Sequence, residues 1–415
     1  MIDANDFDIT YGDGSGASGD YFTDVLNLGG GASLTAQTMG IAHNSTLSPG
    51  LLGIGYDTNE ASDALETPFI YSSVVDSMVT QGLISLKAYS LYLNDLDAST
   101  GVLIFGGLDS DKYQGNLVQL PILPDEGSNG ASVYQEFNVA LTSYAITSTP
   151  GKSTTLTDGS FQIAALLDSG TSLTYLPTDL TSAIYNELDG AFDEESQLTF
   201  FNCDLLTQFP DLTFDYGFGG SSGGVIRVPI VELILPASEF VGDYQPNVSF
   251  ANPCAMGILP QDQAPYILGD TFLRSAYVVY DLANNVIGIG QTNFDSTTSN
   301  IVDFAADASS ITSVSGAPTS SVIVEPSGTG ASVTNGASQS GSTETTGIFG
   351  SLPTTGLGLP TGGQGTSSST GSSVTSSSTG KASAGVTTTP FDFGGMVVVG
   401  VSAAFAVLGG VLMLA

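Results

Sequence analysis

Hydrophobic and polar residues alternate in short runs along most of the chain, a pattern that favours β-strands over helices. Near the start, Phe7, Ile9 and Tyr11 alternate with polar residues, and the glycine-rich segment 12–16 follows them. Because glycine-rich tips join antiparallel strands, we expect a hairpin over residues 1–30. Such a tip is mobile enough to serve as a lid over a binding site.

Other apolar runs are bounded by glycine, proline or asparagine, which predicts further strands separated by tight turns. These runs lie at residues 89–93, 101–107, 212–235, 276–281 and 286–289. Two segments have the length and the flanking residues typical of helices, namely 69–86 and 178–190. Strands dominate, so the folded part is expected to be mostly β.

The clearest chemical signal is the apolar run 164–167, which is followed directly by the acidic residue Asp168. A carboxylate at the end of a buried strand is costly unless it is hydrogen-bonded. The hydroxyl groups of Ser169 and Thr171 are available to donate, and Gly170 allows other backbone to approach closely. We therefore expect a carboxylate held for catalysis, although Asp-Ser-Gly alone is also typical of a plain turn between strands.

The composition is strongly acidic, since 6 Lys and Arg against 41 Asp and Glu give a formal net charge of −35. This charge argues against nucleic-acid binding, which needs a positive surface. It fits an extracellular protein that works in acid, and it would attract cationic substrates. The alternative is that the acidity only keeps a secreted protein soluble.

Cysteine and histidine are scarce. The two cysteines, Cys203 and Cys254, are expected to form one disulfide, because the rest of the chain has secretory features. A single histidine, His43, gives little support to a zinc site or a Ser-His-Asp triad, so we expect no metal site. Sequons at Asn44 and Asn247 predict two surface glycans.

The C-terminal part differs in composition from the rest. Large apolar residues become scarce and Ser, Thr and Gly dominate, so residues 296–390 are expected to form a disordered stalk. The final segment, 391–415, ends in a long apolar run without charge. Small residues, a short spacer and this tail predict a GPI-anchor signal with Ser383 as the attachment residue and Ala384 or Gly380 as alternatives. A C-terminal transmembrane helix is the alternative.

Several segments together resemble parts of the pepsin-like aspartic proteases, and the fungal yapsin and candidapepsin group most of all. The matching parts are the flap at 7–15 with Tyr11 as its tyrosine, the apolar-Gly element 52–55, the lobe connection 104–115, the active-site signature 168–171, the second apolar-Gly element 267–270, and the disulfide between Cys203 and Cys254. Six matches over residues 5–295 are far more specific than one tripeptide.

This resemblance implies a mostly β, bilobal acid-protease fold. Residues 1–115 would be the remainder of the N-terminal lobe with the flap, and residues 116–295 the C-terminal lobe. It also implies an aspartic endopeptidase in which Asp168 is catalytic and no cofactor is needed. The flap and substrate-binding residues would be Tyr11, Gly12, Asp13, Ser169, Gly170, Thr171 and Ser172.

The same resemblance implies the partners and location of the protein. We expect an extracellular monomer, anchored at the plasma membrane or cell wall, that cuts peptides or proteins with basic residues near the cleavage site. Asp13 near the flap tip is compatible with that preference, although aspartate in Gly-Asp-Gly is equally typical of a turn.

One part of the family pattern is absent. A first Asp-Thr-Gly or Asp-Ser-Gly would precede the flap, and none does; residues 1–6 also lack the features of a signal peptide. We interpret the chain as truncated at its N-terminus and expect weak or no peptidase activity, because Asp168 would have no acidic neighbour with which to share a proton. The alternative is a catalytically dead surface protein that binds peptides or builds cell wall. A lipocalin-like carrier is disfavoured, because it explains neither Asp168 nor the paired apolar-Gly elements.

Overall fold

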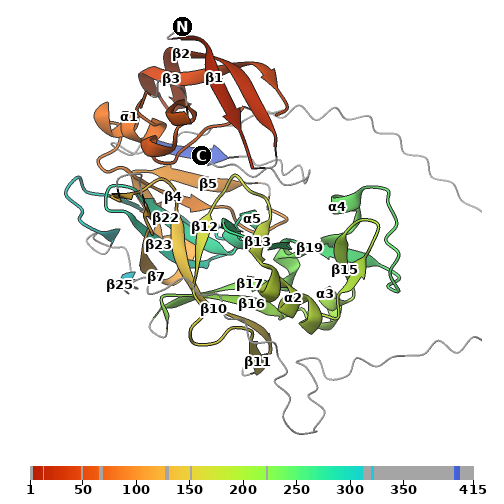
Figure 1. Cartoon of the computed structure of the whole chain (residues 1–415). Helices are drawn as coiled ribbons and strands as arrows, with labels where there is room; N and C mark the ends of the chain where they lie inside the picture. The colour runs from red at the N-terminus through yellow and green to blue at the C-terminus, as the bar shows by residue number, and fades with distance from the viewer. Residues whose placement is uncertain are drawn as a thin grey trace, which may run out of the picture.

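The structure is a computed structural model of the chain. It describes residues 3–311, together with 319–321 and 397–401, apart from short gaps at 13, 48–49, 65–68, 99, 127–129, 150–151 and 221–222. Asp13, Ser383 and most of the expected stalk and anchor lie outside the described residues. Figure 1 shows several β-sheets with short helices at their edges, as expected from the alternating pattern.

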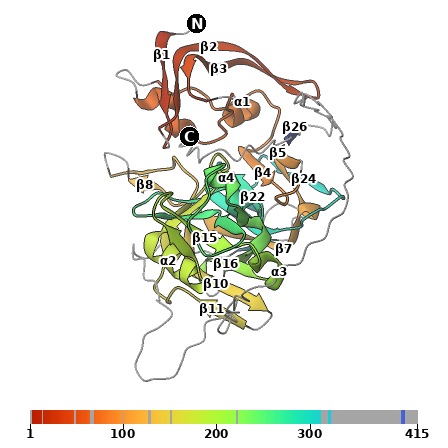
Figure 2. The ribbon, with the colours of Figure 1, turned by 90° about the vertical axis from the view of Figure 1, so that its right-hand side faces the viewer.

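The first sheet is antiparallel and contains β1 (Asp3–Thr10), β2 (Gly16–Gly29) and β3 (Ala32–Ser45). The expected hairpin over residues 1–30 is present, since Thr10 pairs with Gly16 across its tip. Gly19 has to be glycine, because a Cβ there would collide with the Ile41 carbonyl of the neighbouring strand. Figures 1 and 2 show this sheet at one end of the molecule, above the other sheets.

A central sheet takes strands from both halves of the chain. Its order is β25 (Thr319–Ser321), β7 (Tyr113–Pro121), β23 (Val286–Thr292), β22 (Ala276–Asp281), β4 (Ala88–Tyr92), β5 (Gly101–Phe105) and β26 (Val397–Val401). The strands expected at 89–93, 101–107, 276–281 and 286–289 are all in this sheet. The backbone of β26, within the expected anchor segment, pairs antiparallel with β5.

The sheet that positions Asp168 lies in the C-terminal half. Its order is β17 (Gly224–Pro229), β16 (Thr213–Phe218), β10 (Asn138–Thr149), β12 (Ile163–Leu167), β21 (Tyr266–Leu268), β13 (Thr174–Pro177) and β20 (Ile258–Gln261), and β11 (Lys152–Thr155) pairs with β10. Because β12 and β21 run parallel, their carboxyl ends meet at the same edge of the sheet.

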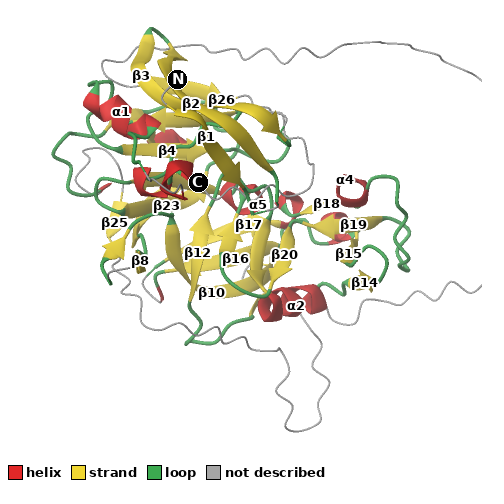
Figure 3. Ribbon diagram, turned by 45° about the horizontal axis from the view of Figure 1, so that its top comes forward, coloured by secondary structure: helices red, strands yellow, loops and turns green. Residues whose placement is uncertain are grey.

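The remaining elements are small. A second sheet of the C-terminal half has the order β14 (Ala191–Asp193), β15 (Leu198–Asn202), β19 (Pro253–Met256) and β18 (Ile234–Pro236). Two further sheets have two strands each. One pairs β6 (Gly107–Asp109) with β24 (Ile301–Asp303), and the other pairs β8 (Asp125–Glu126) with β9 (Ser132–Val133). The helices are α1 (Val74–Thr80), α2 (Thr178–Glu187), α3 (Leu205–Gln208), α4 (Ser238–Val241) and α5 (Asp270–Leu273), which Figure 3 shows in red. α1 and α2 lie inside the two segments expected to be helical.

The packed part of the chain continues past residue 295, where the stalk was expected to begin. β24 pairs with β6, and Phe304 and Ile311 are buried with 3% and 1% of their surface exposed. Phe304, Ala308 and Ile311 join a buried cluster with side chains of the central sheet, and the Asn300 amide donates to Asp109 at 2.8 Å, so the chain stays packed beyond the residue where its composition changes. No helix among the described residues is both long and apolar enough to cross a bilayer.

Candidate active site

The Asp168 loop is fixed to a second loop at the ends of two parallel strands. The Asp168 amide donates to the Leu268 carbonyl at 3.2 Å, continuing the pairing of β12 with β21. The Asp270 amide then donates to the Thr171 carbonyl at 2.8 Å. Gly269 allows this approach, since a Cβ there would collide with the Thr171 carbonyl. The expected bracing element 267–270 therefore lies directly beside the acidic residue.

Two donors hold the carboxylate of Asp168. The Gly170 amide donates to Oδ1 at 2.8 Å, and the Thr171 hydroxyl donates to Oδ2 at 2.6 Å. The expectation that Ser169 also donates is wrong, because Ser169 is exposed and makes no such bond. In this tight turn the backbone two residues on reaches the aspartate instead, as is common for Asp in turns.

Burial is the largest influence on the Asp168 carboxyl group and raises its pKa. The bonds from Thr171 and Gly170 lower that pKa, because they favour the ionised form, and the charge of Glu136 raises it. The surroundings are aromatic: Tyr280 stacks on Tyr89 at 4.8 Å, and its ring also meets Phe137 edge to face at 4.7 Å. A carboxyl group in this setting is suited to proton transfer in the acid range.

Two other carboxyl groups interact with Asp168, so the expectation that it lacks an acidic neighbour is wrong. Asp270 begins α5 beside the loop; burial raises the pKa of Asp270 most, Arg274 lowers it, and the charge of Asp168 raises it further. Glu136 lies two residues before β10, whose pairing with β12 begins at Asn138 and Leu166, and the charge of Glu136 raises the pKa of Asp168. The Asn138 side chain donates to Glu136 Oε2 at 3.0 Å. Sequence reasoning missed Glu136, since only the sheet register brings it here.

A buried ion pair between Arg274 and Glu232 holds the C-terminal end of α5. Arg274 donates through Nε to Glu232 Oε2 and through Nη2 to the Glu232 carbonyl, both at 2.6 Å. Glu232 lies in the 3₁₀ turn Ile230–Glu232, and its other oxygen accepts from the Leu96 amide at 3.2 Å. This pair thus joins α5 to the loop that follows β4.

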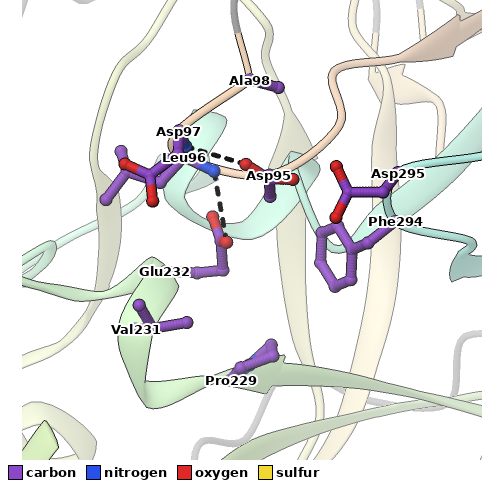
Figure 4. Close-up of a pocket in the computed structure, with 9 residues that line it drawn as sticks. All are labelled: Asp95, Leu96, Asp97, Ala98, Pro229, Val231, Glu232, Phe294 and Asp295. Carbon is purple, nitrogen blue, oxygen red and sulfur yellow. Dashed lines mark hydrogen bonds between the residues drawn. The ribbon is translucent and has the colours of Figure 1, made fainter.

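Glu232 of this ion pair also lines a cavity of about 430 Å³. Figure 4 shows its lining of acidic and apolar side chains: Asp95, Leu96, Asp97, Ala98, Pro229, Val231, Glu232, Phe294 and Asp295. The neighbouring charge of Asp95 raises the pKa of Asp295. Asp168 and the flap residues do not line this cavity, so it is separate from the candidate active site.

The comparisons with known proteins agree with this geometry. The family model described as eukaryotic aspartyl protease matches residues 2–292. The chain belongs to this family. It is 41% identical over 81% of its length to the protein of Aspergillus fumigatus named "Probable aspartic-type endopeptidase opsB", and 36% identical over 70% of its length to candidapepsin-1 of Candida albicans. It spans 66% and 65% of those two relatives.

A solved structure shows the same fold as this aspartyl protease chain. The aspartic proteinase from Irpex lacteus matches with a TM-score of 0.53 and 22% identity, covering 71% of this chain and 83% of that one. The expected mostly β, pepsin-like fold is therefore confirmed.

The residues expected to form the flap are joined by backbone hydrogen bonds on both sides of residue 13, which lies outside the described residues. The Tyr11 amide donates to the Ser15 carbonyl at 2.8 Å, and the Gly14 amide donates to the Tyr11 carbonyl at 2.9 Å. Tyr11 is 8% exposed, and burial raises its pKa, whereas Gly12 is exposed. Among the described residues no hydrogen bond joins Tyr11 to the Asp168 loop.

The remaining expected sites lie away from the Asp168 loop in the sequence and include one partly buried cross-link and two exposed asparagines. Cys203 and Cys254 form the expected disulfide, with their Cα atoms 5.2 Å apart. Asn44 and Asn247 are both exposed, and the Asn247 amide donates to Asp193 at 3.1 Å. Within the described part of the chain, no three His, Cys, Asp or Glu residues form a group that would hold a metal ion.

Proposed function

We propose that this chain is part of an aspartic-type endopeptidase in which Asp168 supplies one of two catalytic carboxylates. The observation that carries the proposal is the geometry of Asp168: two donors fix its oxygens, and burial among aromatic rings raises its pKa. Structural carboxylates at turns are seldom both held and desolvated in this way. Membership in an enzymatic family supports the same assignment.

The reaction is peptide-bond hydrolysis without a covalent intermediate. In aspartic proteases two carboxyl groups about 3 Å apart share one proton, because like charges at that distance do not both ionise. The ionised group removes a proton from a water molecule, which attacks the scissile carbonyl, and the protonated group polarises that carbonyl. The proton then passes to the leaving amine. Activity should therefore peak below neutral pH.

The chain contains one Asp-Ser-Gly, at residues 168–170, and no Asp-Thr-Gly. We therefore expect weak or no turnover from this polypeptide alone. The test is to express residues 1–311 and the full chain and to measure peptide cleavage from pH 3 to 6 with and without pepstatin. Robust pepstatin-sensitive cleavage that Asp168→Ala abolishes would overturn the expectation of low activity while supporting the role of Asp168. Cleavage that persists in Asp168→Ala would overturn that role.

The substrate would be an extended peptide held under the flap. Tyr11 and Gly12 would cover it, Asp13 would face its basic residues, and Ser169 and Ser172 would border it from below. The strongly negative net charge of −35 supports a preference for basic residues. Matched peptides with lysine or norleucine beside the cleavage site, bound to the chain at pH 5, test this preference: equal affinity for both peptides would contradict it.

We further propose a monomeric surface glycoprotein. The Ser/Thr/Gly-rich segment 322–390 and the uncharged C-terminal run support a stalk with an anchor at Ser383, and the exposed Asn44 and Asn247 support two glycans. Mass spectrometry of the protein purified from membranes would identify the glycans and the C-terminal residue. An intact C-terminus ending at residue 415 would contradict the lipid anchor and favour a plain transmembrane segment.

A second candidate is a pseudoprotease that binds peptides or builds cell wall. The single Asp-Ser-Gly favours it, because the family shares its proton between two signature aspartates, and neither Glu136 nor Asp270 belongs to an Asp-Ser-Gly or Asp-Thr-Gly motif. Peptide binding without cleavage at any pH from 3 to 6 would support this candidate over the enzyme.

A further inference from the structure

Both edges of the central sheet are covered by short strands from beyond residue 311. β25 pairs parallel with β7 at one edge, and β26 pairs antiparallel with β5 at the other. Figure 1 shows β26 as the blue arrow between β5 and the first sheet, and Figure 2 labels it beside β5. Neither strand takes part in the proposed cleavage reaction.

The strand β5 has two neighbours, and one of them is β26. On one side β4 pairs with residues 102–105. On the other side β26 pairs with residues 101–105, from Val401 opposite Gly101 to Val397 opposite Phe105. Ile104 is 1% exposed, so backbone groups of this strand that lacked a partner would be held away from water, which is costly. β5 is therefore a sheet edge that needs a covering strand.

The segment that covers β5 has the composition of a strand. Residues 397–401 read Val-Val-Val-Gly-Val, and β-branched residues favour strands over helices. The segment contains neither a charged residue nor proline, the two kinds of residue that keep strands from pairing at an edge. Residues 402–415 contain more Ala, Leu and Met, which are good helix formers. The start of the apolar run thus differs in propensity from the rest.

The length of the intervening chain favours the protein's own segment over that of a second copy. Residues 322–396 lie between β25 and β26. A chain of that length spans about 50 Å as a random coil, which is enough to return to the sheet. Because the segment is tethered, its local concentration at β5 is well above that of a second copy in dilute solution.

We propose that β5 is a docking edge for the C-terminal segment Val397–Val401, which completes the central sheet by strand addition within the same chain. The inference does not rest on the role of Asp168 or on peptide cleavage. A lipid anchor attached at Ser383 would remove this segment, and a membrane-spanning helix would withdraw it, because the same residues cannot be strand and helix at once. Membrane attachment and the completed sheet are therefore alternative states, and attachment leaves the edge of β5 open.

Engineered cysteine pairs test the register of β26 on β5. Gly400 lies directly opposite Val102, a placement that suits a disulfide, and the two native cysteines are already bonded to each other. The full chain with Val102→Cys and Gly400→Cys is oxidised mildly, after mass spectrometry has shown that it extends to residue 415. The control combines Val102→Cys with Val399→Cys, which is one residue out of register. We expect an internal cross-link that forms at least about tenfold faster in the first protein.

The other outcomes of the cross-linking experiment contradict the proposal. Equal rates for the two cysteine pairs, or no cross-link in either protein, would show that the segment does not pair with β5 in this register. A cross-link that joins two chains, seen as a dimer on a non-reducing gel, would make a second copy the occupant of the edge and would also overturn the proposal.

Amide hydrogen exchange provides a second measurement that needs no cysteine in β5. Val399→Pro changes the central residue of β26, where proline removes an amide and restricts the backbone, so the strand should leave the edge. Amides within residues 101–105 should then exchange at least about tenfold faster than in the wild type. Val386→Pro, the same change outside the paired segment, should leave their exchange unchanged. Unchanged exchange over residues 101–105 in Val399→Pro would overturn the proposal.

Discussion

The Asp168 loop and the flap hairpin are held in different ways. Around Asp168 the strand ends are fully buried, with Leu167 1% and Leu268 0% exposed, and the loop bonds to residues about one hundred positions away. In the sheet β1–β2–β3, Val25 and Ile41 are about half exposed, and the hairpin tip bonds within itself and to the nearby Thr46, whose amide donates to the Gly16 carbonyl at 3.0 Å. The acid is fixed from several sides, whereas the flap is supported by its own sheet.

This difference fits the two roles proposed above, a fixed catalytic carboxylate and a lid. A catalytic carboxylate loses effectiveness when it moves by a fraction of an ångström, so it belongs on rigid elements. A lid has to open and close, and such segments come from the less stable part of a fold. Changes in the C-terminal half should therefore act on stability and on Asp168, and they should leave the flap sheet largely unchanged.

The largest expected effect comes from the disulfide. Replacing Cys203 and Cys254 by serine removes a cross-link over 51 positions and should cost about 4 kcal/mol of unfolding free energy in the chain-entropy model. Urea unfolding under oxidising conditions measures it. Amide hydrogen exchange should become faster in β15 and β19 and stay unchanged in β2 and β3. An equal increase in exchange rate in both sheets would contradict the view that the two regions are stabilised separately.

The next effect comes from the buried ion pair. Glu232→Gln leaves Arg274 without its negative partner and should cost about 3 kcal/mol. The exposed Glu239→Gln is the matched control and should change stability by less than about 0.5 kcal/mol. Denaturant midpoints at pH 6 provide the measurement. A loss no larger than that of the control would show that the pair does not support α5.

The smallest effect is at the carboxylate itself. Thr171→Val removes the hydroxyl that bonds Asp168 Oδ2, which should raise the pKa of Asp168 further and cost about 2 kcal/mol where Asp168 is ionised. Because the lost bond serves the ionised form, the cost should shrink as pH falls and Asp168 protonates. Thr171→Ser keeps the donor and should behave like the wild type. If Thr171→Val lowers the free energy of unfolding by the same amount at every pH, the lost contribution is packing and not the hydrogen bond to Asp168.

The sequence predicted the local parts of this site well. Alternation along the chain predicted the flap hairpin and the strands on both sides of Asp168, and the motif at 267–270 marked the bracing loop. These features are encoded in neighbouring residues, where side-chain period and turn residues decide the structure.

Long-range parts of the site were not predictable in the same way. Glu136 becomes a neighbour of Asp168 only through the register of β10 with β12, and Glu232 meets Arg274 across 42 positions. The donor from Gly170 was missed because it is a backbone group, which sequence motifs do not display. Register and backbone geometry follow from the packing of the whole sheet rather than from any one segment.

The most direct test of the central claim is the binding of pepstatin, measured by titration calorimetry at pH 4 for the wild type and Asp168→Asn. If Asp168 is a catalytic carboxylate, the wild type should bind pepstatin and the variant should bind it at least about tenfold more weakly, because one hydrogen bond to a charged group is lost. Equal affinity for both proteins, or no binding by either, would contradict the account.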